Sequence, residues 1–466
     1  MTSFRPVAAF LAFAWPLVPV VADAAEDVAA LRAELQALKS DYAARVGALE
    51  ARIEQLETAA GSTTAAAAVP PPATEQLPPA SGSRSNATAF NPSISLILDG
   101  NYTATAQDPK TWRIAGFMPS GGDVGPGERS FNLGESELAF AANVDPYFSA
   151  TLIAAISGQD QISVEEAYFR TLALPEGFTA KGGRFFSGFG YLNEVHAHAW
   201  DFVDQPLVYQ AFFGNQYAQD GVQLKWLAPT DLFIEFGAES GNGRAFPATR
   251  LTRNGLNGAT VFAHVGGDVG ATSWRAGASW IELQAQDRSF ADVDEFAQPV
   301  TDAFTGKSRT WVVDAVLKWV PFGNVTGKQL KVQGEYMHRK ESGQLAFDTQ
   351  GLDLSDAYRS EQSGWYLQSV FQFLPRWRVG VRYDALDAGS TRIALITAGL
   401  LPPNAFPVLR AAQPDRISLM FDWNPSEFTR WRAQYAWDDA REDGRRDRQL
   451  RLQYIYGIGA HGAHKY

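Results

Sequence analysis

The chain has 466 residues, of which 45% are hydrophobic and 12% aromatic, and it carries a formal net charge of −11. That charge argues against nucleic acid as a partner, and the absence of cysteine excludes a disulfide framework. Beyond the N-terminus no run of about 18 apolar residues occurs, which excludes a membrane protein built from transmembrane helices.

Residues 1–24 have the pattern of a secretory signal peptide. Arg5 supplies the basic start, an apolar run follows over 7–21, and the A-x-A motif at 22–24 is a cleavage site. We therefore expect an exported chain whose mature form begins at Ala25. An uncleaved membrane anchor is the alternative, but the apolar run is short and contains two prolines.

Residues 25–57 are predicted to form a short α-helical coiled coil in the periplasm. From Leu31 to Leu56, apolar residues recur at alternating spacings of three and four. This pattern favours self-association, with a homotrimer as the natural form if each protomer carries a barrel. A single amphipathic helix lying on the barrel or on peptidoglycan is the alternative. Residues 58–89 are rich in Ala, Pro and Ser and predict an extended linker.

From residue 90 to residue 466 the side chains alternate in character with a period of two. In 376–385, RWRVGVRYDA, the charged residues share one parity and the aromatic and aliphatic residues share the other. Segments 430–438 and 449–456 repeat the pattern. Because successive side chains of a strand lie on opposite faces, each segment has a polar and an apolar face. In an exported chain this indicates lipid on one side and a water-filled lumen on the other.

The connections between the expected strands alternate in length. Short turns containing proline or glycine separate longer loops, which are expected at 105–130, 188–218, 240–257, 286–308, 340–362 and 388–413. Outer-membrane barrels have short periplasmic turns and long extracellular loops. The sequence therefore predicts an all-β fold, a transmembrane antiparallel β-barrel of about sixteen strands. We expect it in the bacterial outer membrane, surrounded by lipid and lipopolysaccharide, with the N-terminal segment in the periplasm.

Seven basic residues have the parity predicted to face the lumen, and all lie late in the chain: Lys331, Arg376, Arg378, Arg382, Arg430, Arg432 and Arg451. Adjacent strands lie about 4.8 Å apart, so these side chains would form a basic arc on one side of the pore. Such an arc attracts anions. The alternative is that they pair with carboxylates of the same parity and make the wall rigid: Glu335, Asp384, Asp422 and Asp438.

The connection 188–218, GFGYLNEVHAHAWDFVDQPLVYQAFFGNQYA, is too aromatic for a loop that meets only water. We expect it to fold into the barrel as a constriction. It carries five titratable residues of interest: Glu194, His196, His198, Asp201 and Asp204. In an extended segment the first three share a face and could bind a borderline metal such as zinc. The metal would be a transported or regulatory ligand, since no resident cofactor is expected. The alternative is that the histidines only form hydrogen bonds within a packed constriction.

Several segments resemble a family of coiled-coil-bearing, plugless outer-membrane porins. They are FNPSISLILDGNY at 90–102, GRFFSGFGYLN at 183–193, HAHAWDFVDQPLVYQAFFGNQ at 196–216 and the ending GAHGAHKY. Members of this family are named zinc-regulated TonB-dependent outer-membrane receptors or porins, and they are similar in layout to phosphate-selective and siderophore porins. A TonB-dependent receptor has a plug domain and a barrel of about 22 strands. Here only residues 25–89 precede the barrel, so the resemblance implies a plugless porin.

The sequence thus predicts a porin for passive or facilitated uptake of small anionic solutes. An enzyme is not expected, because no G-x-S-x-G, H-E-x-x-H or P-loop lysine motif occurs. One alternative is an uptake receptor for zinc or a metallophore that uses Glu194, His196 and His198. The other is an envelope tether, in which the coiled coil binds peptidoglycan and the barrel is only an anchor.

Overall fold

The computed structural model of the protein describes residues 92–459, apart from 122–123, 159–160, 250–253, 322 and 325. The described residues belong to one compact unit. The predicted signal peptide, coiled coil and linker, and the ending GAHGAHKY, lie outside them. None of the helices in this part of the chain is long and apolar enough to cross a bilayer.

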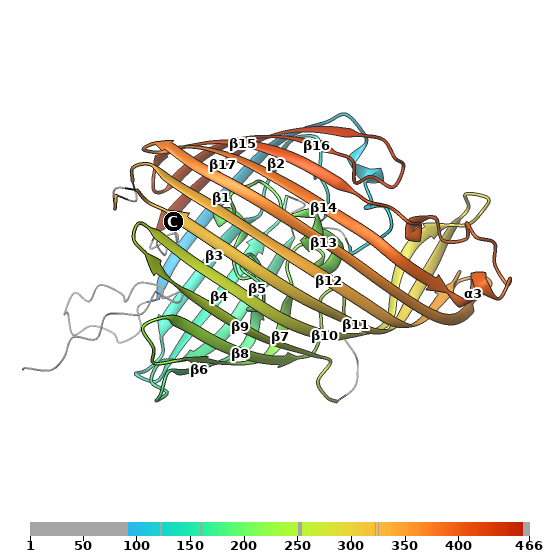
Figure 1. Cartoon of the computed structure of the whole chain (residues 1–466), viewed down its shortest axis with the longest axis horizontal. Coiled ribbons are helices and arrows are strands. Elements are labelled where there is room, and N and C mark those ends of the chain that lie inside the picture. Colours follow the sequence, from blue (N-terminus) through green and yellow to red (C-terminus); the bar gives the residue numbers. More distant parts are fainter. Residues whose placement is uncertain are drawn as a thin grey trace, which may run out of the picture. The chain divides into compact units, whose positions relative to one another are not determined.

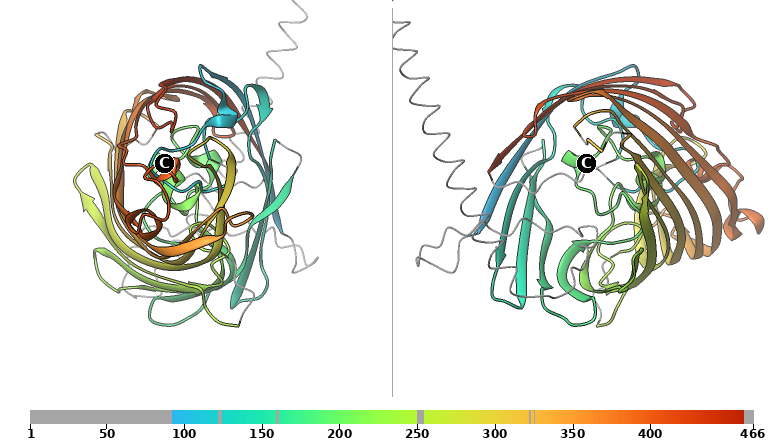
Figure 2. Two further views of the ribbon diagram at one scale, coloured as in Figure 1. Left: turned by 90° about the vertical axis from the view of Figure 1, so that its right-hand side faces the viewer. Right: turned by 60° about the vertical axis from the view of Figure 1, so that its left-hand side comes forward.

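Seventeen strands form one antiparallel sheet that closes on itself (Figures 1 and 2). In chain order the strands are β1 (Ser93–Thr105), β2 (Ser130–Leu133), β3 (Ser136–Asn143), β4 (Phe148–Ile156), β5 (Ile162–Thr171), β6 (Phe178–Phe186), β7 (Ala218–Leu227), β8 (Phe233–Gly241), β9 (Gly258–Val269), β10 (Thr272–Val293), β11 (Pro299–Trp319), β12 (Gln329–Phe347), β13 (Leu354–Leu374), β14 (Trp377–Ile393), β15 (Asp415–Ser426), β16 (Thr429–Asp438) and β17 (Asp447–Gly459). The connections contain short helical segments, namely η1 (Pro109–Thr111), η2 (Ala197–Ala199), α2 (Leu207–Phe213), α3 (Ala394–Thr397) and η3 (Pro407–Leu409).

The first strand closes the barrel. β1 pairs with β17 on one edge and with β2 and then β3 on the other. Because β2 and β3 follow each other along β1, the seventeen strands occupy sixteen positions around the barrel. The predicted strand number is therefore confirmed. Closure gives each of the sixteen positions a paired neighbour on both sides, and such pairing is what a sheet in hydrocarbon requires because no water is available to bond its backbone groups.

The strands on one side of the barrel are much longer than those on the other. β10–β14 contain 17–22 residues each, whereas β3–β9 contain 8–12. In Figure 1 the long strands extend past the others towards α3. The predicted loops at 286–308 and 340–362 are wrong, because most of their residues extend these strands. Phe290, Phe304 and Tyr358 of the extensions are buried in one apolar cluster with Phe406 of the β14–β15 connection, and this packing stabilises strands where the sequence indicated loops.

The burial of side chains is the reverse of that in a soluble protein. On β14, Val379, Val381 and Tyr383 are 38–42% exposed on the outer face, whereas Arg382 and Asp384 of the opposite face are at most 1% exposed. β16 and β17 repeat this arrangement. From Trp377 onwards, the parity predicted for these three segments is thus confirmed. An apolar outer face and a polar inner face are what a strand between lipid and an aqueous lumen requires.

Exposed aromatic side chains gather near the ends of the strands that are joined by short turns. They include Phe178, Trp319, Trp423, Trp431 and Tyr456. Trp377 at the start of β14 and Trp423 near the end of β15 stack on each other, with ring centroids 5.5 Å apart. Aromatic girdles of this kind mark the boundary between hydrocarbon and water in membrane proteins.

Candidate functional site

The connection between β6 and β7, residues 187–217, folds into the lumen, and we call it the inserted loop. In Figure 2 it is the green segment inside the ring of strands. All seven residues of α2 are buried, and the helix ends at Gly214, whose φ of 64° is the left-handed conformation that favours glycine. Val208 and Phe212 belong to a buried apolar cluster that includes Ile281 and Met337 of the wall. The structure therefore places the segment where the sequence predicted a constriction.

One side of the inserted loop is bound to an arginine-rich wall through Asp204. Its carboxylate lies 2.7 Å from Arg382 Nη2, 2.9 Å from Arg416 Nη1 and 3.3 Å from Arg451 Nη1. Burial opposes ionisation of Asp204, but the three guanidinium groups outweigh it and hold the pKa of the carboxyl below its usual range. Asp204 is therefore a buried anion held by a set of cations from β14, β15 and β17.

Asp201 extends this contact towards the ends of the strands joined by short turns. Its two oxygens accept hydrogen bonds from Lys331 Nζ at 2.9 Å and from Arg378 Nη1 at 3.2 Å. Arg430 and Arg432 donate to the carbonyl oxygen of Trp200, at 3.2 and 2.7 Å. These side chains anchor the loop backbone to the wall.

Of the seven residues predicted to line the pore, six lie on the lumen wall as just described, and one does not. Arg376 lies in the turn between β13 and β14, with a φ of 73°, and is exposed. Its prediction as a pore-lining residue is wrong, because the hairpin turns at this position and the alternation of faces starts only with Trp377.

The predicted pairing of the wall's own carboxylates holds for two of the four. Asp384 lies 3.0 Å from Arg382 and Asp422 lies 2.8 Å from Arg432. Glu335 instead accepts hydrogen bonds from the inserted loop, at 3.0 Å from Leu192 N and 2.8 Å from the hydroxyl of Tyr209, and at 2.8 Å from Tyr366. Asp438 accepts from Trp112 Nε1, Ala440 N and Gln449 Nε2. Both carboxylates bind neutral donors, so these two pairings were predicted wrongly.

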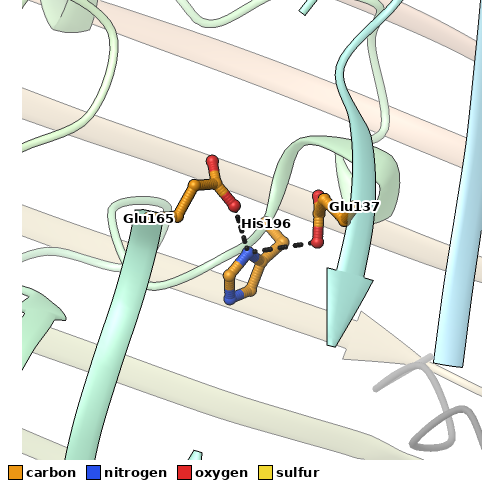
Figure 3. A group of neighbouring side chains, drawn as sticks. All are labelled: Glu137, Glu165 and His196. Atoms are coloured by element: carbon orange, nitrogen blue, oxygen red, sulfur yellow. Dashed lines mark ion pairs between the residues drawn. The ribbon is translucent and has the colours of Figure 1, made fainter. Parts of the chain in front are cut away.

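The opposite side of the inserted loop lies against an acidic wall formed by β3 and β5. His196 Nε2 lies 3.1 Å from Glu166, while His196 Nδ1 lies 3.4 Å from Glu165 and 3.5 Å from Glu137 (Figure 3). His198 Nδ1 lies 2.8 Å from Glu137. Burial disfavours the charged imidazole, but these carboxylates outweigh it and raise the pKa of His196 well above its usual value.

A β-bulge brings two consecutive glutamates to the same side chain. The register of β4 and β5 shifts between Ile153 and Ala154, which pair with Glu166 and Val164 respectively, so Glu165 is the extra residue. A bulge interrupts the alternation of faces, which explains how Glu165 and Glu166 both reach His196. No strict parity rule could have predicted this cluster from the sequence.

The predicted ligand set of Glu194, His196 and His198 is not assembled. Residues 190–194 form a turn, so the segment is not extended as the prediction assumed. Glu194 lies 3.3 Å from Lys225 of β7. Burial opposes its ionisation, but Lys225 and Lys181, with smaller contributions from His264 and Arg275, lower the pKa of Glu194 to about 2. Glu194 therefore belongs to a basic environment, and the two histidines belong to an acidic one.

Sequence reasoning missed most of a second basic group, which we call the basic rim: Lys181, Lys225, Arg275, Lys318 and Lys331. All five lie close to the ends of the strands joined by short turns, and Lys318 and Lys331 are direct partners across β11 and β12. Their side chains are partly exposed, with Lys225 and Lys331 at 16% and 23%. The strands before β10 carry many small residues, which weaken the contrast between the lipid-facing and the lumen-facing positions in the sequence.

The inserted loop reaches the basic rim through one aromatic residue. Arg275 and Lys331 lie over the ring of Tyr191, at 5.3 and 5.1 Å from its centroid. Burial opposes ionisation of this phenol, yet Lys331, Lys318 and Arg275 lower the pKa of Tyr191. The rim therefore generates a positive potential at the surface of the inserted loop.

Comparison with known proteins finds a relative in sequence, whereas comparison with families does not. No family model matches the chain. An uncharacterized protein of Aquifex aeolicus (strain VF5) is 31% identical over 403 residues, which cover 81% of this chain and 80% of that protein.

Solved structures with a similar fold include outer-membrane channels. An anion-selective porin from Comamonas acidovorans superposes with a TM-score of 0.48 and 11% identity over 79% of this chain and 99% of that one. The trimer form of OmpT from Vibrio cholerae superposes with a TM-score of 0.46 and 9% identity over 79% of this chain and 99% of that one. The outer-membrane channel DcaP of Acinetobacter baumannii superposes with a TM-score of 0.45 and 13% identity over 79% of this chain and 96% of that one.

Proposed function

The chain belongs to the same family as the uncharacterized Aquifex aeolicus protein, and we propose that it is an outer-membrane porin for small anionic solutes. The observation that carries this proposal is the partly exposed basic rim on the lumen side of a closed barrel. The inserted loop packs against the wall inside the lumen, and we expect it to narrow the passage beside the rim. A solute would therefore meet the rim where the passage is narrow.

The outer surface of the barrel supports a place in the outer membrane. Its strands expose apolar side chains and carry aromatic residues near the ends joined by short turns. The expected signal peptide directs such a chain out of the cytoplasm. Because short turns are periplasmic in barrels of this class, the basic rim would lie at the periplasmic end of the lumen.

The basic rim, and not the arginine-rich wall, would select the solute. Arg382 and Arg416 are 1% exposed and are bound to Asp204 and Asp384, so a passing ion cannot reach them. The lysines of the rim also have acidic neighbours, Glu194 beside Lys225 and Asp201 beside Lys331, but their side chains are partly exposed and a passing anion could reach them. Two unit charges 4 Å apart interact by about 4 kcal/mol at an effective dielectric constant of 20, which is enough to favour anions strongly. Since salt screens exposed charges over about 8 Å at physiological ionic strength, the preference should weaken at high salt.

The proposal is tested by the reversal potential of the purified protein in planar bilayers under a KCl gradient. We expect anion selectivity for the wild type, and a shift towards cations for Lys181→Glu combined with Lys225→Glu. Each lysine substitution is also made singly, and Arg376→Glu is the matched control for these, because it makes the same change of charge as one of them at an exposed turn outside the lumen. Cation selectivity of the wild type, or an equal shift in the control, would contradict the proposal.

A further inference from the structure

Three side chains from separate parts of the chain bring ligand atoms together at the acidic wall. Glu137 lies on β3, Glu165 on β5 and His196 on the inserted loop. One ligand atom from each lies within 4.8 Å of the other two. Figure 3 shows both carboxylates directed at the same ring nitrogen of His196. The cluster therefore spans the gap between the barrel wall and the inserted loop.

The two distances from His196 Nδ1 to the carboxylates are close to those between ligands of one shared cation. His196 Nδ1 lies 3.5 Å from Glu137 Oε2 and 3.4 Å from Glu165 Oε2. Nitrogen and oxygen ligands at about 2.0–2.1 Å from a tetrahedral Zn²⁺ ion are about 3.3–3.4 Å from each other. Hydrogen bonds of this kind are shorter, with a usual range of about 2.7–3.2 Å.

Two of these ligand atoms are buried without a hydrogen-bond partner. They are His196 Nδ1 and Glu165 Oε2, and His196 is only 8% exposed. Leaving a buried polar atom unsatisfied costs about 1–3 kcal/mol. A bound cation would satisfy both atoms and would offset the repulsion between neighbouring carboxylates.

The surrounding contacts orient the ligands as in known metal sites. His196 Nε2 lies 3.1 Å from Glu166, so a proton on Nε2 is donated to that carboxylate. A bound cation would displace the proton on Nδ1, the nitrogen that faces Glu137 and Glu165, and would take its lone pair. His198 Nδ1 lies 2.8 Å from Oε1 of Glu137, the oxygen that is not the candidate ligand. Ligating histidines usually donate their second N–H to a carboxylate, and ligating carboxylates are themselves hydrogen-bonded.

We propose that Glu137, Glu165 and His196 bind one divalent cation of the zinc class, which links the inserted loop to the barrel wall. A mixed set of imidazole and carboxylate ligands suits such ions. The site shares only His196 with the ligand set predicted from the sequence. It also goes beyond the proposed anion channel, because it concerns a bound ion that holds the loop and not the solute that passes.

The test is calorimetric titration of the full-length protein in detergent with ZnCl₂, after treatment with a chelator. We expect one zinc ion per protomer for the wild type, and affinity at least about tenfold weaker for His196→Ala and for Glu165→Gln. His338→Ala is the matched control, since it removes a histidine paired with Glu361 in an exposed part of β12 and β13. That variant should bind zinc like the wild type.

Glu165→Gln keeps the shape of the side chain, so it remains informative if His196→Ala does not fold. The visible absorption of Co²⁺ titrated into the same proteins is a second readout, which should depend on His196 and not on His338. Absence of zinc binding by the wild type, or equal affinity in Glu165→Gln, would overturn the proposal. Because no transport is measured, either result leaves the proposed anion channel untouched.

Discussion

Asp204 shows how single residues decide which charges of the lumen remain accessible. It binds three arginines, and its backbone carbonyl accepts a further bond from Arg382 at 2.7 Å. The cations that the sequence assigned to the pore are therefore largely committed to the inserted loop. A parity rule places a side chain on a face, but it does not identify the partner that the side chain meets there.

Substitution of Asp204 should release the inserted loop. Asp204→Asn leaves three buried guanidinium groups without their shared anion, and removal of one member of a buried ion pair costs about 3–5 kcal/mol. We expect hydrogen–deuterium exchange of residues 197–213 to become at least about a hundredfold faster, at about 1.4 kcal/mol per factor of ten. Asp231→Asn, at an exposed turn, is the control. Unchanged exchange in Asp204→Asn would show that apolar packing alone holds the loop.

The lowered pKa of Asp204 predicts that the inserted loop stays docked against the wall in mild acid. The pKa of Asp204 is lower in the folded state than the unfolded value of about 3.9. Its stabilising contribution is therefore complete above the unfolded pKa and is lost only as the pH falls through the lower, folded-state pKa. Exchange of residues 201–213 should stay slow from pH 7 down to about pH 4. Loss of protection already between pH 6 and pH 5 would exclude Asp204 as the group that controls docking.

The inserted loop is the element whose contacts depend most on the tertiary structure. Its aromatic composition indicated that it packs inside the barrel, and the structure places α2 there. The contacts made by its ends were not predictable, because the turn at 190–194 separates Glu194 from the histidines. The bulge in β5 supplies glutamates that no local motif marks.

Replacement of residues 196–213 by a short Gly-Ser linker should increase the single-channel conductance several-fold. The deletion removes α2 and the residues that fill the centre of the lumen, whereas β6 and β7 pair with each other through their own backbones. Replacement of 399–403, in the connection between α3 and η3, by a linker of the same composition is the control. An unchanged conductance in the first variant would mean that the inserted loop does not limit the passage.

The whole molecule depends on closure of the sheet. Within the described residues the strands pair all the way round the barrel, including β1 with β17. We therefore expect the barrel to fold without the predicted coiled coil, so that self-association and barrel folding are separable.

A chain that begins at residue 90 should refold in detergent into a barrel with the conductance of the full-length protein. Heat-modifiable electrophoretic mobility would report folding, and chemical cross-linking would report the oligomeric state. If residues 25–57 form the trimeric coiled coil that the sequence predicts, the full-length chain should cross-link to trimers more completely than the shortened one. Failure of the shortened chain to fold would contradict the independence of the barrel.

By itself the sequence determined the antiparallel barrel, the number of strand positions and the face of each late strand. These properties follow from the alternation of polar and apolar side chains and from the turn residues, both of which can be recognised within a single segment. Only the tertiary structure decided that Arg382 is neutralised by Asp204, that Lys181 and Lys225 are partly exposed, and that His196 meets Glu137 and Glu165. These contacts join residues far apart in the chain, and they depend on one inserted loop and one bulge whose geometry no periodic pattern encodes.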